Sequence, residues 1–86
     1  MDINQLIAIV KKKLSSEIQL ESINIEDKSF LHKNHRNNEI GKFHLKVLIQ
    51  SKELSKKSKI ERNRIVYKIL NEEIKLYIHS LQILIN

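Results

Sequence analysis

Two strand-like segments that enclose a helical segment do most to limit the folds open to this chain. Apolar residues occupy alternate positions from Phe43 to Ile49, the pattern of a strand with one buried face. The segment from Ile78 to Ile85 is also strand-like, and apolar residues at helical spacing between the two predict a helix over about 58–74. A helical connection predicts that the two strands are parallel neighbours joined by a right-handed crossover.

The N-terminal part of the chain predicts a further helix and strand. Asp2 and Gln5 have the spacing of an N-cap and its reciprocal partner, and apolar residues follow at steps of three and four, so a helix is expected at about 2–17. Ile23 and Ile25 alternate with polar residues and predict a strand at about 20–26, antiparallel to a second strand at about 42–50. We therefore expect one α+β domain over residues 1–86 with the order αββαβ, a three-stranded mixed sheet and helices on one face.

The same patterns predict which side chains are buried. Lys11, Lys12 and Lys13 fall mostly off the apolar face of the first helix and are interpreted as solvated, and Glu72 and Glu73 as surface charge. Phe43 and Tyr67 are expected in the core. The apolar face of the second long helix, which begins near Ser55 with a kink or a short turn and runs to about Leu76, consists of Ile60, Val66, Tyr67, Ile69, Leu70 and Ile74.

Composition limits the function. The chain has 86 residues, no cysteine and a formal net charge of +6, so it has no disulfide and no thiolate chemistry of its own. No apolar run is long enough to span a membrane, and the N-terminus lacks signal-peptide features, which favours a cytoplasmic protein. No catalytic constellation or phosphate-binding loop is present, which indicates a non-enzymatic protein.

Four short motifs, in their order and spacing, resemble the BolA-like family from about Ile25 to Ile85. They are the D-x-S-x-x-H of Asp27–His32, the strand start around Phe43 and His44, the R-x-R-x-V-Y of Arg62–Tyr67 and the H-x-L of His79–Leu81. The chain departs from the family pattern at Leu54 (an aromatic), Lys56 (glycine), Asn63 (histidine) and Ser80 (alanine). The resemblance implies a class II KH-like sandwich, which agrees with the periodicity.

The resemblance also implies a function. It implies an adaptor that binds a monothiol glutaredoxin and shares a 2Fe-2S cluster with it and with glutathione. The isolated protein is expected to hold no cofactor and to be a monomer or a weak homodimer. The resemblance places His79 as the first cluster ligand and His32 as the second, with His35 as the alternative to His32. Imidazole can replace thiolate on one iron of such a cluster, and the partner would supply the thiolates this chain lacks.

From the residues alone, the histidines remain ambiguous. His79 has the strand parity of Leu81 and Ile83, so alternation favours a packed, hydrogen-bonded ring over a metal ligand. His35 completes a His-x-x-His spacing with His32, which is a weak metal signal equally compatible with a solvated ring. His44 is interpreted as structural or as part of the rim of a site.

Nucleic-acid binding is the alternative function. Basic residues cluster around the start of the second long helix and favour a polyanion: Lys52, Lys56, Lys57, Lys59, Arg62, Arg64 and Lys68. Some BolA-like proteins are considered transcription regulators that contact DNA through this region. The G-x-x-G clamp of RNA-binding KH domains is excluded because Gly41 is the only glycine. A third interpretation is a charged adaptor surface for an acidic protein.

Overall fold

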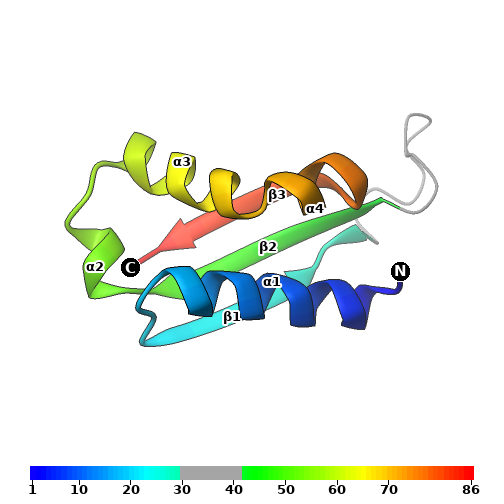
Figure 1. Cartoon of the computed structure of the whole chain (residues 1–86), viewed down its shortest axis with the longest axis horizontal. Coiled ribbons are helices and arrows are strands. Elements are labelled where there is room, and N and C mark those ends of the chain that lie inside the picture. Colours follow the sequence, from blue (N-terminus) through cyan, green and yellow to red (C-terminus); the bar gives the residue numbers. More distant parts are fainter. Residues whose placement is uncertain (30–41) are drawn as a thin grey trace.

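The three-stranded sheet has the predicted topology. The computed structural model describes residues 1–29 and 42–86, in the order α1 (Ile3–Glu17), β1 (Ser22–Asp27), β2 (Phe43–Gln50), α2 (Lys52–Ser55), α3 (Lys59–Ile69), α4 (Asn71–Leu76) and β3 (Ile78–Ile85). The strand order is β1-β2-β3, with β1 antiparallel and β3 parallel to β2 (Figure 1). The α+β class, the mixed sheet and the β2–β3 pairing are therefore confirmed.

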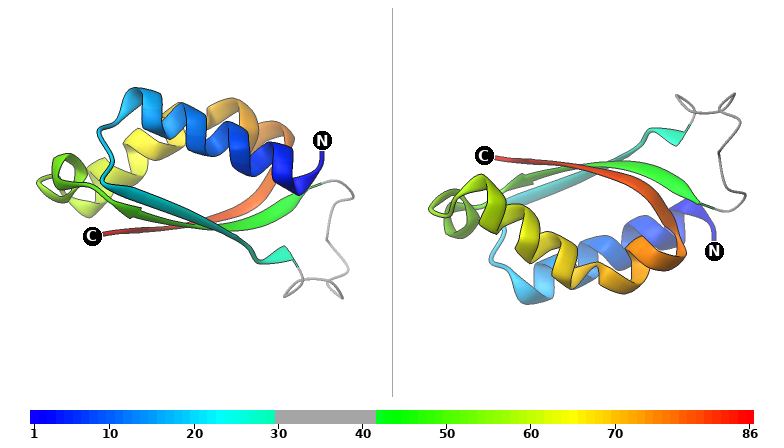
Figure 2. Two further views of the ribbon diagram at one scale, coloured as in Figure 1. Left: turned by 90° about the horizontal axis from the view of Figure 1, so that it is seen from below. Right: turned by 90° about the horizontal axis from the view of Figure 1, so that it is seen from above.

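The helices cover one face of the sheet, as predicted (Figure 2). Alternate residues of the central strand β2 point into this interface, where Leu45, Val47 and Ile49 are buried. They pack with the buried stripe of α1 and with Val66 and Leu70 of the helical connection. The opposite face of the sheet carries the other set of alternating side chains, including Lys46 and Gln82.

Helix α1 forms as its sequence predicts. The Asp2 carboxylate accepts a hydrogen bond from the Gln5 backbone N–H at 2.8 Å, and the Gln5 side chain accepts one from the Asp2 N–H at 3.0 Å. This capping box satisfies backbone donors that have no partner inside the helix. The apolar stripe is confirmed by the complete burial of Leu6, Val10 and Leu14.

The helix predicted over about 58–74 is divided at Leu70 into α3 and α4, so its description as one continuous helix is wrong, and a separate short helix, α2, precedes it. Ser51 and Ser58 act as N-caps and start two helices, with Ser51 Oγ accepting from the Leu54 N–H and Ser58 Oγ from the Glu61 N–H. At Leu70 the backbone leaves helical geometry, with φ −96° and ψ 18°. Backbone hydrogen bonds from Leu70 to Val66 and from Ile74 to Leu70 continue across this point, so α3 and α4 form a bent path that keeps Leu70 buried.

Three predicted side-chain positions are also wrong. Ile60 is 71% exposed and Tyr67 is 42% exposed, because their side of α3 lies beside the edge of the sheet rather than over its face. Glu73 is only 6% exposed, because it turns inward and binds Lys13 of α1. Helical spacing defines a stripe, but the position of the sheet decides which part of that stripe is covered.

Two departures from the family pattern fit their places in the fold. Leu54 is buried at 1% exposure and fills an apolar position. Lys56 has φ −77° and ψ −12°, a right-handed conformation that does not require glycine. In the described part of the chain, no helix combines the length and the hydropathy needed to cross a membrane.

Candidate functional site

A β-bulge re-aims the side chain of His79. Phe43 pairs with Ile78, but the next residue of β2, His44, pairs with Ser80, so His79 is an extra residue in β3. Such a bulge breaks the simple alternation of side chains and is common beside functional sites. Ile78 is buried and His79 is exposed, so the packed ring that strand parity favours is not what forms.

The ring of His44 packs against the ring of His79. Its side chain is buried at 5% exposure, and its ring centroid lies 4.9 Å from that of His79 in an edge-to-face arrangement of 62°. Nδ1 of His44 lies 2.6 Å from Ser80 Oγ, which is hydrogen-bonding distance. The structural role predicted for His44 agrees with this burial, and the serine that replaces the family alanine acquires a partner.

The turn from Asp27 to Ser29, which is the D-x-S part of the first motif, is hydrogen-bonded to the backbone of His44. The Asp27 carboxylate accepts a hydrogen bond from the Ser29 N–H at 2.9 Å, and Ser29 Oγ accepts one from the His44 N–H at 3.1 Å. The His44 carbonyl accepts from the Lys28 N–H at 2.7 Å. Sequence reasoning matched Asp27 and Ser29 to the family motif but missed this connection, which depends on the alignment of β1 with β2.

The described residues place one of the three predicted cluster ligands. His79 is exposed at the start of β3, whereas His32 and His35 lie outside the described residues. Ser29 and Lys42, which border residues 30–41, lie at the same end of the sheet as His79. Within residues 1–29 and 42–86, no three His, Cys, Asp or Glu side chains are grouped so as to hold a metal ion.

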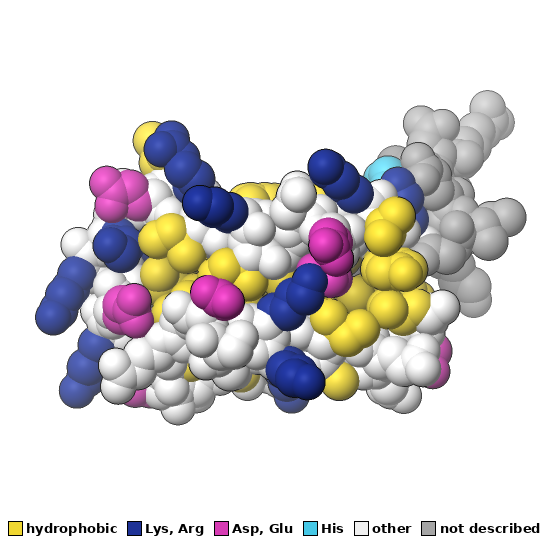
Figure 3. Space-filling view, in the orientation of Figure 1, with side chains coloured by type: hydrophobic (Ala, Val, Ile, Leu, Met, Phe, Trp, Pro, Cys, Tyr) yellow, Lys and Arg dark blue, Asp and Glu magenta, His cyan; other side chains and the backbone are white. Residues whose placement is uncertain are grey.

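The predicted basic residues lie toward the other end of the molecule, which is 39 Å long, and along α3 (Figure 3). Lys52, Lys56 and Lys57 are exposed around α2 and the turn that follows it. The basic residues of α3 lie on different sides of the helix: Lys59 and Arg62 border β3, Lys68 lines the hollow between α1 and α3, and Arg64 is exposed. The predicted set therefore covers several faces rather than one.

Arg62 has a structural role that the sequence did not reveal. Its Nε donates a hydrogen bond to the Lys57 carbonyl at 2.8 Å, and its Nη2 donates one to the Ser55 carbonyl at 2.9 Å. These carbonyls lie at the end of α2 and in the turn before α3, so Arg62 closes that turn. Removal of its side chain would change the shape of the basic end as well as its charge.

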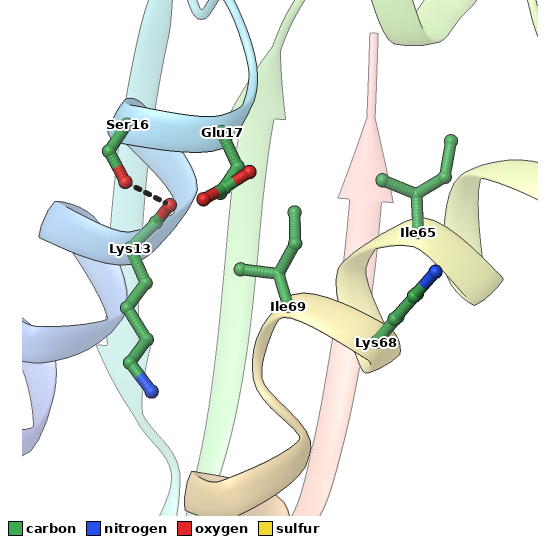
Figure 4. Close-up of a pocket in the computed structure, with 6 residues that line it drawn as sticks. All are labelled: Lys13, Ser16, Glu17, Ile65, Lys68 and Ile69. Atoms are coloured by element: carbon green, nitrogen blue, oxygen red, sulfur yellow. Dashed lines mark hydrogen bonds between the residues drawn. The ribbon is translucent and has the colours of Figure 1, made fainter.

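A groove of about 610 Å³ lies between α1 and α3 (Figure 4). It is lined by Lys13, Ser16 and Glu17 from α1 and by Ile65, Lys68 and Ile69 from α3. Of the predicted site residues, Lys68 lines it. The groove combines opposite charges with two isoleucines, and none of the described residues that line it is a predicted cluster ligand.

An ion pair beside this groove joins α1 to α4. Lys13 Nζ lies 2.9 and 2.7 Å from the two carboxylate oxygens of Glu73. The hydrogen bond to Glu73 raises the pKa of the Lys13 ammonium above its ordinary value, with desolvation opposing the shift. Because α4 leads directly into the start of β3, this pair helps to hold the segment that carries His79.

Comparisons with known proteins agree with the fold and with the family resemblance. The family model described as BolA-like protein matches residues 14–86. The DNA-binding transcriptional regulator BolA of Haemophilus influenzae is 34% identical over 73 residues, covering 85% of this chain and 68% of that protein.

Two solved structures from Arabidopsis thaliana are also similar. The BolA domain of SufE1 has a TM-score of 0.79 at 26% identity, with 100% of this chain and 93% of that chain covered. BolA1 has a TM-score of 0.76 at 29% identity, with 92% and 87% covered. The family-model match over residues 14–86 and the 34% identity to the Haemophilus influenzae relative, together with the shared fold, lead to one conclusion: the chain belongs to the BolA-like protein family.

Proposed function

We propose that this protein is a non-enzymatic adaptor that binds a monothiol glutaredoxin and shares a 2Fe-2S cluster with it. The observation that carries the proposal is the exposed His79 on its bulge, backed by the buried ring of His44. An imidazole held in this way is accessible to a metal centre on a second molecule while its backbone is fixed by the sheet. Its accessibility distinguishes it from a core histidine.

The donor set of the chain fits a shared cluster. The sequence contains four histidines and no cysteine, so it offers imidazole nitrogen ligands and no thiolate ligands. Thiolates of the glutaredoxin and of glutathione would complete the coordination, with His79 and His32 contributing nitrogen and His35 as the alternative to His32. The bound cluster would be cargo for transfer or for sensing, because mixed nitrogen and sulfur ligation alters its redox potential and stability.

His44 and Ser80 would position the ligand rather than contact the cluster. The hydrogen bond between His44 Nδ1 and Ser80 Oγ fixes the ring that lies against His79. The Asp27–Ser29 turn fixes the backbone of the same residue. Together these contacts restrict the orientations of the His79 ring before a partner binds, which reduces the ordering entropy to be lost on binding.

Reconstitution with a purified monothiol glutaredoxin, glutathione, iron and sulfide tests this proposal. We expect the visible absorption and circular dichroism spectra of the cluster to change when this protein is added, reaching a limit at a fixed ratio of the two proteins. Glutaredoxin with glutathione and cluster, but without this protein, is the control. Spectra that remain those of the control at every ratio would contradict the proposal.

A DNA-binding function is the second candidate. It is supported by the exposed Lys52, Lys56 and Lys57 around α2 and by the name of the Haemophilus influenzae relative. Phosphate contacts from such residues would give affinity that falls steeply with salt. The directions taken by Lys59 and Lys68 reduce the number of phosphates that one duplex face could contact at once.

A further inference from the structure

Strand β3 is an edge of the sheet with backbone groups directed outward. The Asn86 N–H donates to the Ile49 carbonyl, and the Asn86 carbonyl accepts from the Ser51 N–H, so the backbone groups of Asn86 point toward β2. Because these groups alternate along a strand, those of Leu81, Ile83 and Ile85 point away from the sheet. The Leu81 carbonyl confirms this direction, since it accepts a hydrogen bond from the Tyr67 hydroxyl of α3 at 3.2 Å.

This edge lacks the usual protection against pairing with another strand. Charged residues, proline or short length in an exposed edge strand commonly prevent it from pairing with a strand of another chain. The other edge, β1, is six residues long and ends with Glu26 and Asp27. In contrast, β3 is eight residues long and has the sequence IHSLQILI, without a charged residue or a proline. The Tyr67 hydroxyl donates a hydrogen bond to the Leu81 carbonyl of this edge. The outward backbone groups of Ile83 and Ile85 lie further along β3, toward its C-terminal end.

Beside the C-terminal half of β3 lies a groove of about 380 Å³ with a basic wall. Lys59, Arg62 and Asn63 of α3 line it together with residues 83–85 of β3, the following Asn86 and Leu48 of β2. Asn63 shares its side of α3 with Ile60 and Tyr67, which are spaced at helical intervals and exposed. A strand added here would bury the apolar side chains of Ile60 and Leu84 and meet positive charge.

Charge selects the kind of strand that fits. A second copy of this chain would bring its own uncharged β3, which offers no acidic side chain to Lys59, and each molecule carries a net charge of +6. Like charges across an interface oppose association. An extended segment with acidic side chains would instead pair with Lys59, and its main chain would bond the outward groups of Ile83 and Ile85.

We propose that the β3 edge binds an extended acidic segment of a partner protein as a fourth strand. Main-chain hydrogen bonds would supply the affinity, and the basic wall of α3 would select acidic side chains. This surface is separate from the histidine end of β3, so the proposal does not depend on cluster binding.

A blocked octapeptide of alternating valine and glutamate is a suitable probe, with backbone amide NMR of the uniformly ¹⁵N-labelled protein as the measurement. We expect shifts and slowed amide exchange at Ile83 and Ile85, whose N–H groups would become hydrogen-bonded. The same peptide N-methylated at alternate residues keeps the charge but loses the donors of one edge. It should bind at least about tenfold more weakly, since several hydrogen bonds are lost.

Two charge reversals provide a matched pair. Lys59→Glu and Arg64→Glu change the net charge equally on the same helix, but Lys59 lines the edge groove and Arg64 does not. We expect Lys59→Glu to weaken peptide binding by about tenfold, and Arg64→Glu by less than about threefold. Circular dichroism and the amide spectrum of each free variant establish that the fold is retained.

Three results would overturn the proposal. The first is equal affinity for the N-methylated peptide, which would mean that charge alone attracts the probe. The second is equal affinity for a valine–lysine peptide. The third is protection of Ile83 and Ile85 that rises with protein concentration in the absence of peptide, which would assign the edge to a second copy of the chain.

Discussion

The two ends of this molecule differ in how they are built. At the histidine end, the exposed ring of His79 lies against the buried ring of His44, which is held by two other segments, around Ser29 and Ser80. At the basic end, Lys52, Lys56 and Lys57 project from a four-residue helix and a turn that Arg62 closes through two backbone carbonyls. One end presents an exposed side chain that packs on a buried ring, and the other presents exposed charges around a local turn.

This difference indicates which kind of ligand each end can select. An oriented imidazole suits a directional bond, such as coordination to iron, because its position is fixed before binding. Long lysine side chains around a turn suit screened contacts with a polyanion, which require charge more than geometry. Because the two ends are separated along the 39 Å axis, substitutions at one end should leave the other unaffected.

The largest expected effect is that of His79→Ala on the complex with glutaredoxin. Removal of a ligand should shorten the lifetime of the mixed cluster at least about tenfold, since even supporting residues have effects of about 10–100-fold. Loss of the contact between the two rings should lower the free energy of unfolding by only about 0.5–1 kcal/mol. Cluster absorbance over time and urea denaturation measure the two effects.

The exposed Gln82, on the same strand, provides the control through Gln82→Ala. Unchanged cluster spectra and lifetime in His79→Ala would reject the ligand assignment. We expect His32→Ala to act in the same direction more weakly if His35 substitutes for it, and the double variant to match His79→Ala.

At the basic end, Lys57→Ala combined with Arg64→Ala should weaken binding to duplex DNA similarly for all sequences. If both contact phosphate, the slope of log affinity against log salt should decrease by about 2, and the glutaredoxin cluster spectrum should not change. Fluorescence anisotropy at several salt concentrations measures the slope. Arg62 is left intact because its loss would open the turn.

Lys11→Ala with Lys12→Ala removes the same charge from exposed positions on α1 and serves as the control. An equal loss of affinity in both double variants would show that net charge, rather than the basic end, determines DNA binding. Binding that does not depend on salt would exclude a phosphate-dominated interface.

A smaller effect is expected from the Lys13–Glu73 pair that supports α4. Because the folded state raises the pKa of Lys13, the stability from this group is fully present below its unfolded pKa of 10.5 and is lost as pH rises through the higher folded value. Glu73→Gln should reduce the decline in melting temperature above pH 10.5. Lys13→Met should destabilise the protein more than Glu73→Gln at pH 7, since it leaves the buried carboxylate without this partner.

Thermal melts at pH 7 and from pH 9 to 12 measure these differences. Lys12→Met, on the same helix but exposed, is the matched control. If both Lys13→Met and Lys12→Met melt like the unsubstituted protein at pH 7, the pair does not stabilise α4.

The smallest effect is expected from Ser80→Ala, which restores the residue typical of the family. It removes the hydrogen bond to His44 Nδ1, so the free energy of unfolding should fall by about 1 kcal/mol. The lifetime of the mixed cluster should decrease less than in His79→Ala, because the ligand remains while its support is weakened. Urea denaturation and the His44 ring signals in NMR test this, and unchanged ring signals would contradict a positioning role for Ser80.

Local patterns in the sequence determined the elements and their order. The Asp2–Gln5 spacing predicted the start of α1, alternation from Phe43 predicted β2, and the helical connection predicted the parallel pairing of β3. These features depend on backbone hydrogen bonds and on which face of an element is apolar, both of which are encoded over a few neighbouring residues.

Only the tertiary structure decided which side chains of each helix and strand are covered by other parts of the protein. The bulge that exposes His79, the inward turn of Glu73 toward Lys13 and the exposure of Ile60 at the sheet edge all depend on residues distant in sequence. The hydrogen bond between His44 and Ser80 joins positions 36 residues apart through the register of β2 with β3. A periodic pattern specifies a stripe of side chains, but strand register and helix placement determine whether that stripe is covered by protein or left for a partner.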